Sequence, residues 1–244
     1  MNKVIIIDDE PLAREVVKEY LEAFAELQVV AECNDGFEAV KAISAHQPDL
    51  IFLDIQMPKI SGFEMLELLE EPPAVIFATA FDEFAIKAFE ANAVDYLLKP
   101  FSEDRFSAAV RKYLDQRGEV RSRIPALMES IQKDAPLQRI VIRDGTKIKI
   151  VPLHEVIMLE AADDYVKIHT KAGVYLKKKT MSSFEQSLPE TQFVRVHRSY
   201  IVNISEITRI DPMEKENHVA LLKSGVRVPV SKSGYQKLKS CLDL

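Results

Sequence analysis

A chain of 244 residues that is 47% hydrophobic and 29% charged has the composition of an ordinary globular protein with room for two domains. Charged residues interrupt every apolar stretch within about 20 residues, which excludes a membrane-spanning helix. No signal peptide is visible at the N-terminus, and Cys33 and Cys241 lack a CxxC or metal-type spacing, so we expect a protein of the reducing cytoplasm.

The formal net charge of −6 is unevenly distributed along the chain. Residues 1–137 carry 14 basic and 26 acidic side chains, whereas residues 138–244 carry 18 basic and 12 acidic ones. An acidic half joined to a basic half indicates two parts with different partners, and a polyanion is the natural partner of the basic half.

Residues 1–116 alternate short β-branched runs with amphipathic helical patterns. Strands that are apolar throughout need cover on both faces, so this pattern predicts an α/β domain with a doubly wound, five-stranded parallel sheet. The expected strands are Lys3–Ile7, Gln28–Glu32, Leu50–Leu53, Val75–Ala78 and Val94–Leu98. The expected helices are Leu12–Phe24, Gly36–Ala45, Gly62–Leu69, Glu83–Phe89 and Glu103–Leu114.

Residues 117–137 differ in character from the segments on either side. They mix charged residues with Pro125 and Pro136 and have no convincing apolar face. We expect a linker that could be helical near Ala126–Gln132, and the sequence leaves open whether it is a rigid helix or a flexible tether.

From residue 138 onward the hydrophobic period becomes two, which predicts a mainly β domain over residues 138–244. The first two strands, Arg139–Arg143 and Lys147–Val151, flank the turn-forming pair Asp144-Gly145. Helices are expected at Thr180–Leu188 and Ser231–Leu242. Further short strands are expected at Val156–Glu160, Tyr165–Thr170, Val174–Leu176, Phe193–Val196, Ser199–Val202, Ile207–Ile210, His218–Leu222 and Arg227–Val230.

Polar residues follow or end the first, third, fourth and fifth expected strands of the first half. They are Asp8 and Asp9, Asp54, Thr79, and Lys99. The carboxyl ends of parallel strands meet at one edge, so these side chains are expected in one crevice. Three crowded carboxylates need a cation, and Mg²⁺ is a hard ion that suits them. A carboxylate can accept a phosphoryl group, and the central Asp54 is the acceptor we expect.

Two alternatives compete with this pocket. An isolated Asp after a strand is usually a helix cap, but five suitable residue types at the expected strand ends favour a shared site. An aspartate-nucleophile phosphatase would need a second acid two residues after the nucleophile. Gln56 stands there, so we discount that enzyme.

The first half resembles the receiver domain of two-component response regulators over residues 2–116. The resemblance rests on Asp8-Asp9-Glu10-Pro11, Asp54-Ile55-Gln56-Met57-Pro58 with Gly62, Thr79-Ala80 and Lys99-Pro100. It implies that Asp54 is the phosphoacceptor, that Mg²⁺ is held by Asp9, Asp54 and the Gln56 carbonyl, and that Asp8 acts through water. Thr79 and Lys99 would contact the phosphoryl group.

The same resemblance implies that Tyr96 turns inward on activation. The alternative for Tyr96 is a half-buried strand aromatic without a switching role. We also expect a cis peptide bond before Pro100.

The second half contains no GxSxG, HExxH, P-loop or cysteine pair, so we do not expect an enzyme. Basic and polar side chains instead gather in three expected loops, and such groups can contact phosphates and base edges. The alternatives are a solvated surface for the lysines and a structural hydrogen bond for His197. The loop residues are Lys177, Lys178, Lys179 and Thr180; His197, Arg198 and Ser199; and Ser231, Lys232 and Ser233.

Residues 138–243 resemble the LytTR DNA-binding domain. The motifs are Leu159-Glu160 to Ile168, Phe193-Val-Arg-Val-His197-Arg198-Ser199 to Asn203, and Gly225 to Ser231. That family has a mostly β fold whose loops insert into successive major grooves, often as dimers on direct repeats. The resemblance places Tyr165 in the first base-facing loop, His197 and Arg198 in the second, and Lys232 and Ser233 at the start of the last helix. Lys177–Lys179 would hold phosphates.

Together these features predict a LytTR-type response regulator of a two-component system. A histidine kinase would phosphorylate Asp54, Thr79 and Tyr96 would move, and the face formed by Glu83–Phe89, Val94–Leu98 and Glu103–Leu114 would dimerise. The homodimer would then bind double-stranded DNA. Two alternatives stay open: an output domain that binds a protein partner, and DNA binding that does not depend on phosphorylation.

Overall fold

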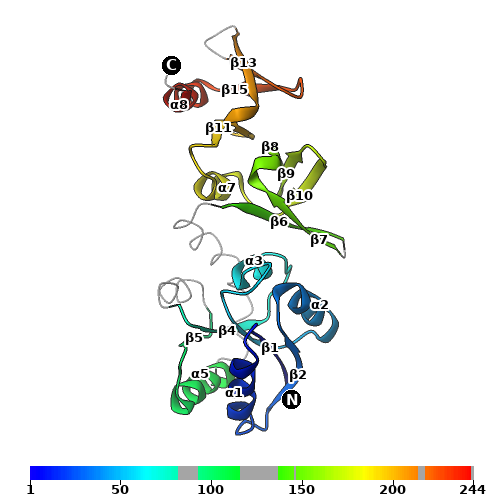
Figure 1. Cartoon of the computed structure of the whole chain (residues 1–244), viewed down its shortest axis with the longest axis vertical. Helices are drawn as coiled ribbons and strands as arrows, with labels where there is room; N and C mark the ends of the chain where they lie inside the picture. The colour runs from blue at the N-terminus through cyan, green and yellow to red at the C-terminus, as the bar shows by residue number, and fades with distance from the viewer. Residues whose placement is uncertain (82–92, 116–136, 146, 214–217, 243–244) are drawn as a thin grey trace. The chain divides into compact units, whose positions relative to one another are not determined.

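The computed structural model describes residues 1–81, 93–115, 137–145, 147–213 and 218–242 (Figure 1). The chain divides into two compact units, Met1–Ile131 and Gln132–Leu244. In the described parts, no helix combines the length and the apolar character needed to cross a membrane. The expected helix Glu83–Phe89 and nearly all of the expected linker 117–137 lie outside the described residues, so both stay predictions.

The first unit contains a five-stranded parallel sheet in the order β2-β1-β3-β4-β5, which confirms the predicted doubly wound architecture. All residues of β3 and β4 are buried, as expected for strands covered on both faces. The strands are β1 (Asn2–Ile7), β2 (Leu27–Cys33), β3 (Leu50–Leu53), β4 (Ala74–Thr79) and β5 (Asp95–Leu98).

Helices cover both faces of this sheet (Figure 1). On one face, α1 (Pro11–Leu21) and α5 (Glu103–Asp115) pack on alternate strand residues, with Phe106 stacked 5.1 Å from Phe52. On the other face lie α2 (Gly36–His46) and α3 (Gly62–Leu66).

The helix α3 is shorter than the expected Gly62–Leu69. It ends at Leu66 because, after the Glu67 amide, which still donates to the Phe63 carbonyl, the amides of Leu68 and Leu69 donate to carbonyls three residues earlier rather than four.

The second unit is mainly β, as predicted. A hairpin of β6 (Arg139–Asp144) and β7 (Lys147–Pro152) turns at Gly145, whose φ is 61°. A five-stranded sheet has the antiparallel order β10-β9-β8-β12-β11, and a three-stranded sheet has the order β13-β14-β15. Their bounds are β8 (Val156–Ala162), β9 (Tyr165–Thr170), β10 (Gly173–Lys177), β11 (Phe193–His197), β12 (Tyr200–Asn203), β13 (Ile207–Pro212), β14 (His218–Leu222) and β15 (Arg227–Val230).

Each face of the five-stranded sheet has its own core. Leu159 and Ile168 belong to a cluster with the β6–β7 hairpin and α7 (Met181–Ser187). Met158 and Val202 belong to a second cluster with the three-stranded sheet and α8 (Lys232–Leu242). Because neighbouring strand residues point to opposite faces, the period of two in the sequence builds both cores.

Candidate functional site

The carboxyl ends of four parallel strands bring the predicted pocket residues together in the first unit. Asp8 follows β1, Asp54 follows β3, Thr79 ends β4 and Lys99 follows β5. The Lys99 ammonium lies 2.7 Å from an Asp8 oxygen and 3.4 Å from an Asp54 oxygen. The cis peptide bond expected between Lys99 and Pro100 is confirmed.

Three carboxylates form the acidic side of the pocket. One oxygen each from Asp8, Asp9 and Asp54 lie within 4.8 Å of one another, with Asp8 and Asp54 buried. Burial raises the pKa of the Asp8 carboxyl in spite of hydrogen bonds from Lys99 and from the Glu10 amide. Crowded oxygen donors of this kind suit a hard divalent cation, and receiver domains in general bind Mg²⁺ at such a pocket.

Lys99 is the cation that balances part of this charge. Burial alone would lower the pKa of its ammonium, but the hydrogen bond to Asp8 and the charges of Asp54 and Asp8 outweigh burial and raise that pKa. Lys99 is therefore protonated at neutral pH and positioned beside Asp54.

Unlike Lys99, the Thr79 side chain makes no hydrogen bond within the described residues. Thr79 is fully buried, and its Oγ1 has no hydrogen-bond partner among the residues that the structure describes. A buried hydroxyl without a partner costs free energy, about 1–3 kcal/mol. An oxygen-rich ligand in the pocket would satisfy it.

Glycine allows α3 to begin against the acidic pocket. A Cβ at Gly62 would lie 2.3 Å from the Asp54 carbonyl oxygen. The Gly62 amide donates to the Ile55 carbonyl at 2.8 Å, and the Gln56 amide lies 3.4 Å from Asp54 Oδ1. The Asp54 loop is thus folded back on α3, with Gln56 exposed.

Two contacts at the pocket were not predicted. Glu10 Oε2 lies 3.1 Å from the Lys99 ammonium, and Arg14 donates to the Asp8 carbonyl at 2.7 Å. Glu10 directly follows Asp9 in the motif that identified the site, so proximity in sequence was the available signal. Arg14 lies in the first turn of α1, which follows this motif directly.

Tyr96 is buried rather than half-buried. Its exposed fraction is 6%, its hydroxyl donates to the Phe81 carbonyl, and its ring lies 6.2 Å from that of Phe77. The Arg105 guanidinium binds both Asp95 oxygens, at 2.7 and 3.0 Å, and the Tyr96 carbonyl at 2.9 Å. Tyr96 is therefore tied to α5 through its backbone. Its switching role stays a prediction.

In the second unit, the predicted loops gather at one end of the five-stranded sheet. Tyr165 begins β9 just after the β8–β9 turn and is 45% exposed. The Ala161 amide beside that turn donates to the carbonyl of Ser199, in the β11–β12 turn, at 2.9 Å. Lys177, at the end of β10, pairs with Val166 of β9 near the same end.

The three neighbouring lysines have different environments, which corrects one expectation. Lys177 is buried, and its ammonium donates to the Val141 carbonyl at 2.7 Å, so it is directed into the core rather than toward a phosphate. Lys179 lies over the Phe184 ring, 5.1 Å from its centre. Lys178 is exposed.

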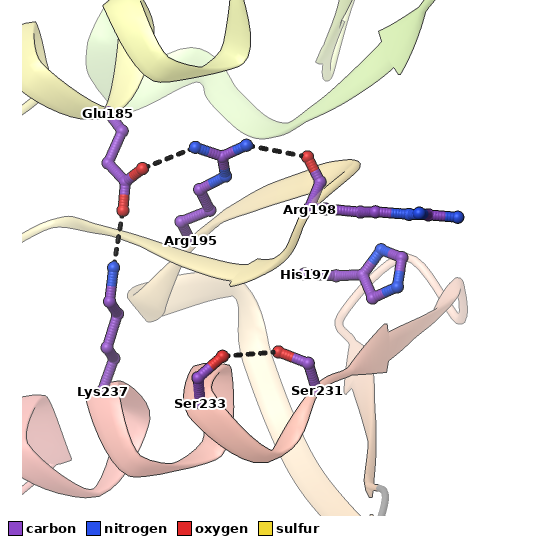
Figure 2. Close-up of a pocket in the computed structure, with 7 residues that line it drawn as sticks. All are labelled: Glu185, Arg195, His197, Arg198, Ser231, Ser233 and Lys237. Carbon is purple, nitrogen blue, oxygen red and sulfur yellow. Dashed lines mark hydrogen bonds and ion pairs between the residues drawn. The ribbon is translucent and has the colours of Figure 1, made fainter.

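The β11–β12 turn and the start of α8 line one pocket (Figure 2). His197 Nδ1 accepts a hydrogen bond from the Ser199 amide at 3.2 Å, so a neutral ring carries its proton on Nε2. His197 therefore has the structural hydrogen bond of the alternative interpretation, and its Nε2–H is available as a donor. The exposed Arg198 side chain extends on the same side of the turn as the His197 ring (Figure 2).

The start of α8 is held by Ser231. Its hydroxyl donates to the Val196 carbonyl at 3.1 Å and accepts from the Gly234 amide at the same distance. Ser231 is therefore a helix cap, and its expected contact with DNA stays a prediction. Lys232 and Ser233 are exposed.

Three residues that line this pocket were not predicted: Glu185, Arg195 and Lys237. Arg195 lies two residues before His197 on β11, in the motif that pointed to this turn, so proximity in sequence was the available signal. Glu185 on α7 and Lys237 on α8 come from distant segments. Their approach depends on how the helices pack, and the sequence holds no signal for it.

Comparison with known proteins supports the family expected for each half of the chain. Residues 4–111 match the response regulator receiver domain, and residues 146–243 match the LytTr DNA-binding domain. Sensory transduction protein LytT of Bacillus anthracis is 35% identical over 247 residues, which cover 99% of each chain. Transcriptional regulatory protein BtsR of Escherichia coli K12 is 34% identical over 247 residues and 100% of each chain.

A solved LytTr DNA-binding domain from Bacillus cereus is also similar to this chain. The two are 29% identical with a TM-score of 0.42, and the match covers 44% of this chain and 99% of the other. With both family models matched in order and full-length relatives above 30% identity, the chain belongs to the LytTR family of response regulators, two-component transcriptional regulators that join a receiver domain to a LytTr DNA-binding domain.

Proposed function

We propose that a sensor histidine kinase transfers a phosphoryl group to Asp54 and that this transfer controls DNA binding by the second unit. The observation that carries the proposal is the position of Lys99, whose ammonium contacts both Asp8 and Asp54. The neighbouring Thr79 hydroxyl has no hydrogen-bond partner in the part of the chain that the structure describes. A carboxylate, a cation and a hydroxyl donor lie together at one edge of the sheet, and phosphoryl transfer to an aspartate uses these groups.

In this proposal, Asp9, Asp54 and the Gln56 carbonyl would hold Mg²⁺, and Asp8 would act through water. The ion would supply positive charge that offsets the charge of the incoming phosphoryl group. An Asp54 oxygen attacks phosphorus, the bond from phosphorus to the donor histidine nitrogen breaks, and that nitrogen keeps the electron pair. Lys99 and Thr79 then contact the phosphoryl oxygens.

The output step would pass from Thr79 to Tyr96. Attraction of Thr79 to the phosphoryl group changes the packing around Tyr96, whose backbone is tied to α5 through Arg105. The altered face favours a homodimer, and two linked DNA-binding domains gain affinity for direct repeats through effective concentration. His197, Arg198, Lys232 and Ser233 would face base edges, with Tyr165 in the neighbouring loop and Lys178 on a phosphate.

The test combines phosphorylation and DNA binding on the same sample. Wild type should acquire covalent phosphate from acetyl phosphate only with Mg²⁺, and then bind duplex DNA more tightly, with an affinity that falls steeply as salt rises. Asp54→Ala should lose both the phosphate and the gain in affinity. Glu26→Ala is the matched control, because this exposed carboxylate lies next to the amino end of β2, at the opposite edge of the sheet.

Two results would contradict parts of the proposal. Equal DNA affinity and oligomeric state in wild type and Asp54→Ala would mean that DNA binding is independent of phosphorylation. Phosphorylation without any affinity for duplex DNA would favour a protein partner for the second unit.

A further inference from the structure

Arg195 connects a helix to the turn that carries Arg198 (Figure 2). One terminal nitrogen of its guanidinium donates to Glu185 Oε2 at 2.7 Å and to Ser182 Oγ at 3.2 Å, both on α7. The other terminal nitrogen donates to the backbone carbonyl of Arg198 at 3.0 Å. A planar guanidinium can bind two partners in fixed directions at once, so the turn is held at a defined distance from α7.

Glu185 extends this connection to a third element. Its second carboxylate oxygen lies 2.6 Å from the Lys237 ammonium of α8. Burial alone would raise the pKa of Glu185, but hydrogen bonds from Arg195 and Lys237 outweigh it and lower that pKa, so the carboxylate stays charged at neutral pH. One acid therefore joins α7, β11 and α8 at the end of the unit where the predicted DNA-reading loops lie.

Glu185 is a negative charge beside loops that are predicted to bind DNA. A carboxylate beside a surface that approaches phosphates weakens binding by repulsion unless cations of the protein itself neutralise it. Glu185 has two such cations, and the Arg195 side chain is only 23% exposed, in contrast to the exposed Arg198. The Arg195 charge is thus used within the protein.

We infer that Glu185 and Arg195 are positioning residues that hold the Arg198 carbonyl, and so orient the His197–Ser199 turn toward base edges, without touching DNA themselves. The inference rests on the proposed function, because it presumes that the second unit binds duplex DNA. It assigns specificity to a pair of side chains that make no base contact.

The experiment uses the full-length chain and two duplexes. One duplex is selected by the phosphorylated wild-type protein from a randomised pool, and the other is a scrambled duplex of equal length and composition. The ratio of the two affinities measures specificity, and the slope of log affinity against log salt measures phosphate contacts. Thermal unfolding of each variant checks that it folds.

Arg195→Lys is the informative variant, because it keeps the positive charge and loses the planar fork. A positioning role predicts that the specificity ratio falls roughly tenfold, a loss comparable to that of a base contact, while the salt slope stays unchanged. Glu185→Gln keeps the volume of the side chain and should lower the ratio in the same direction. Arg209→Lys on β13 is the matched control, since Arg209 is paired with Asp211 at 2.8 Å outside this network, and it should change neither quantity.

Three outcomes would overturn the inference. An unchanged specificity ratio in both Arg195→Lys and Glu185→Gln would remove the positioning role. A salt slope that falls by about one in Arg195→Met, with equal losses on both duplexes, would show that Arg195 contacts a phosphate directly. Failure of wild type to select any duplex would reject the proposed function itself, and that result is visible before any variant is made.

Discussion

In the first unit α3 begins against the carbonyl of Asp54, and in the second unit α8 begins against the carbonyl of Val196. Both approaches need glycine, because a Cβ would lie 2.3 Å from Asp54 O at Gly62 and 1.9 Å from Val196 O at Gly234. The two sites otherwise differ. The first encloses buried carboxylates and the Thr79 hydroxyl, which has no partner among the described residues. The second pairs the charges of Glu185 and Arg195 and leaves Arg198 exposed. An enclosed site suits a small anion with a metal ion, and an exposed one suits a macromolecule.

The largest expected effect is the loss of stability on replacing the glycines that let α3 and α8 begin against a carbonyl. Gly234→Ala should lower the free energy of unfolding of the second unit by about 3 kcal/mol, because backbone must move to admit the methyl group. Gly62→Ala should do the same in the first unit and also slow phosphorylation. Urea denaturation of the full chain measures both losses. Gly145→Ala is the control: its φ is 61° with open space around it, so only about 1–2 kcal/mol of conformational cost is expected there.

Removal of the Lys99 ammonium tests the acidic pocket of the first unit. Lys99→Met should slow phosphorylation of Asp54 by acetyl phosphate about 100-fold, because a preorganised charge beside the reacting group is lost. The measurement is the initial rate of covalent phosphate incorporation at saturating Mg²⁺. Lys3→Met, at the amino end of β1, should react like wild type. A Lys99→Met rate within a factor of two or so of wild type would contradict the assigned role.

Substitution of the exposed Arg198 and Lys178 tests which basic side chains of the second unit contact bases and which contact phosphates. Arg198→Ala should cost about 1–3 kcal/mol of specific DNA affinity and relax discrimination at one base position. Lys178→Ala should weaken binding to all sequences equally and reduce the salt slope by about one. Binding isotherms of full-length protein across a salt series separate the two patterns. Interchanged patterns would mean that Arg198 holds a phosphate and Lys178 reads a base.

The smallest effect concerns the Thr79 hydroxyl. Thr79→Val removes a buried polar group that has no partner among the described residues, so the free energy of unfolding should stay equal or rise by about 1 kcal/mol. The phosphorylated form should nevertheless lose its DNA-affinity gain. Ser44→Ala, whose hydroxyl donates to the Val40 carbonyl at 2.9 Å, is a control that should keep the gain. A large loss of stability in Thr79→Val would indicate that the hydroxyl has a structural partner.

The sequence by itself was sufficient for the parallel sheet and for the acidic pocket. Asp8, Asp54 and Lys99 each follow an apolar run, and the geometry of parallel strands then brings their side chains to one edge. The period of two likewise predicted the strands of the second unit, since a strand alternates its faces whatever lies beyond them. These features depend on local pattern and on chain direction.

Tertiary structure decided which polar side chains are available at the second site. Lys177 and Lys178 are neighbours in sequence, yet a strand turns one ammonium toward Val141 and leaves the other exposed. Glu185 meets Arg195 and Lys237 only because α7 and α8 both pack beside β11. Pairing between distant segments depends on packing distances of a few ångströms, and no periodicity or motif along the chain encodes those distances.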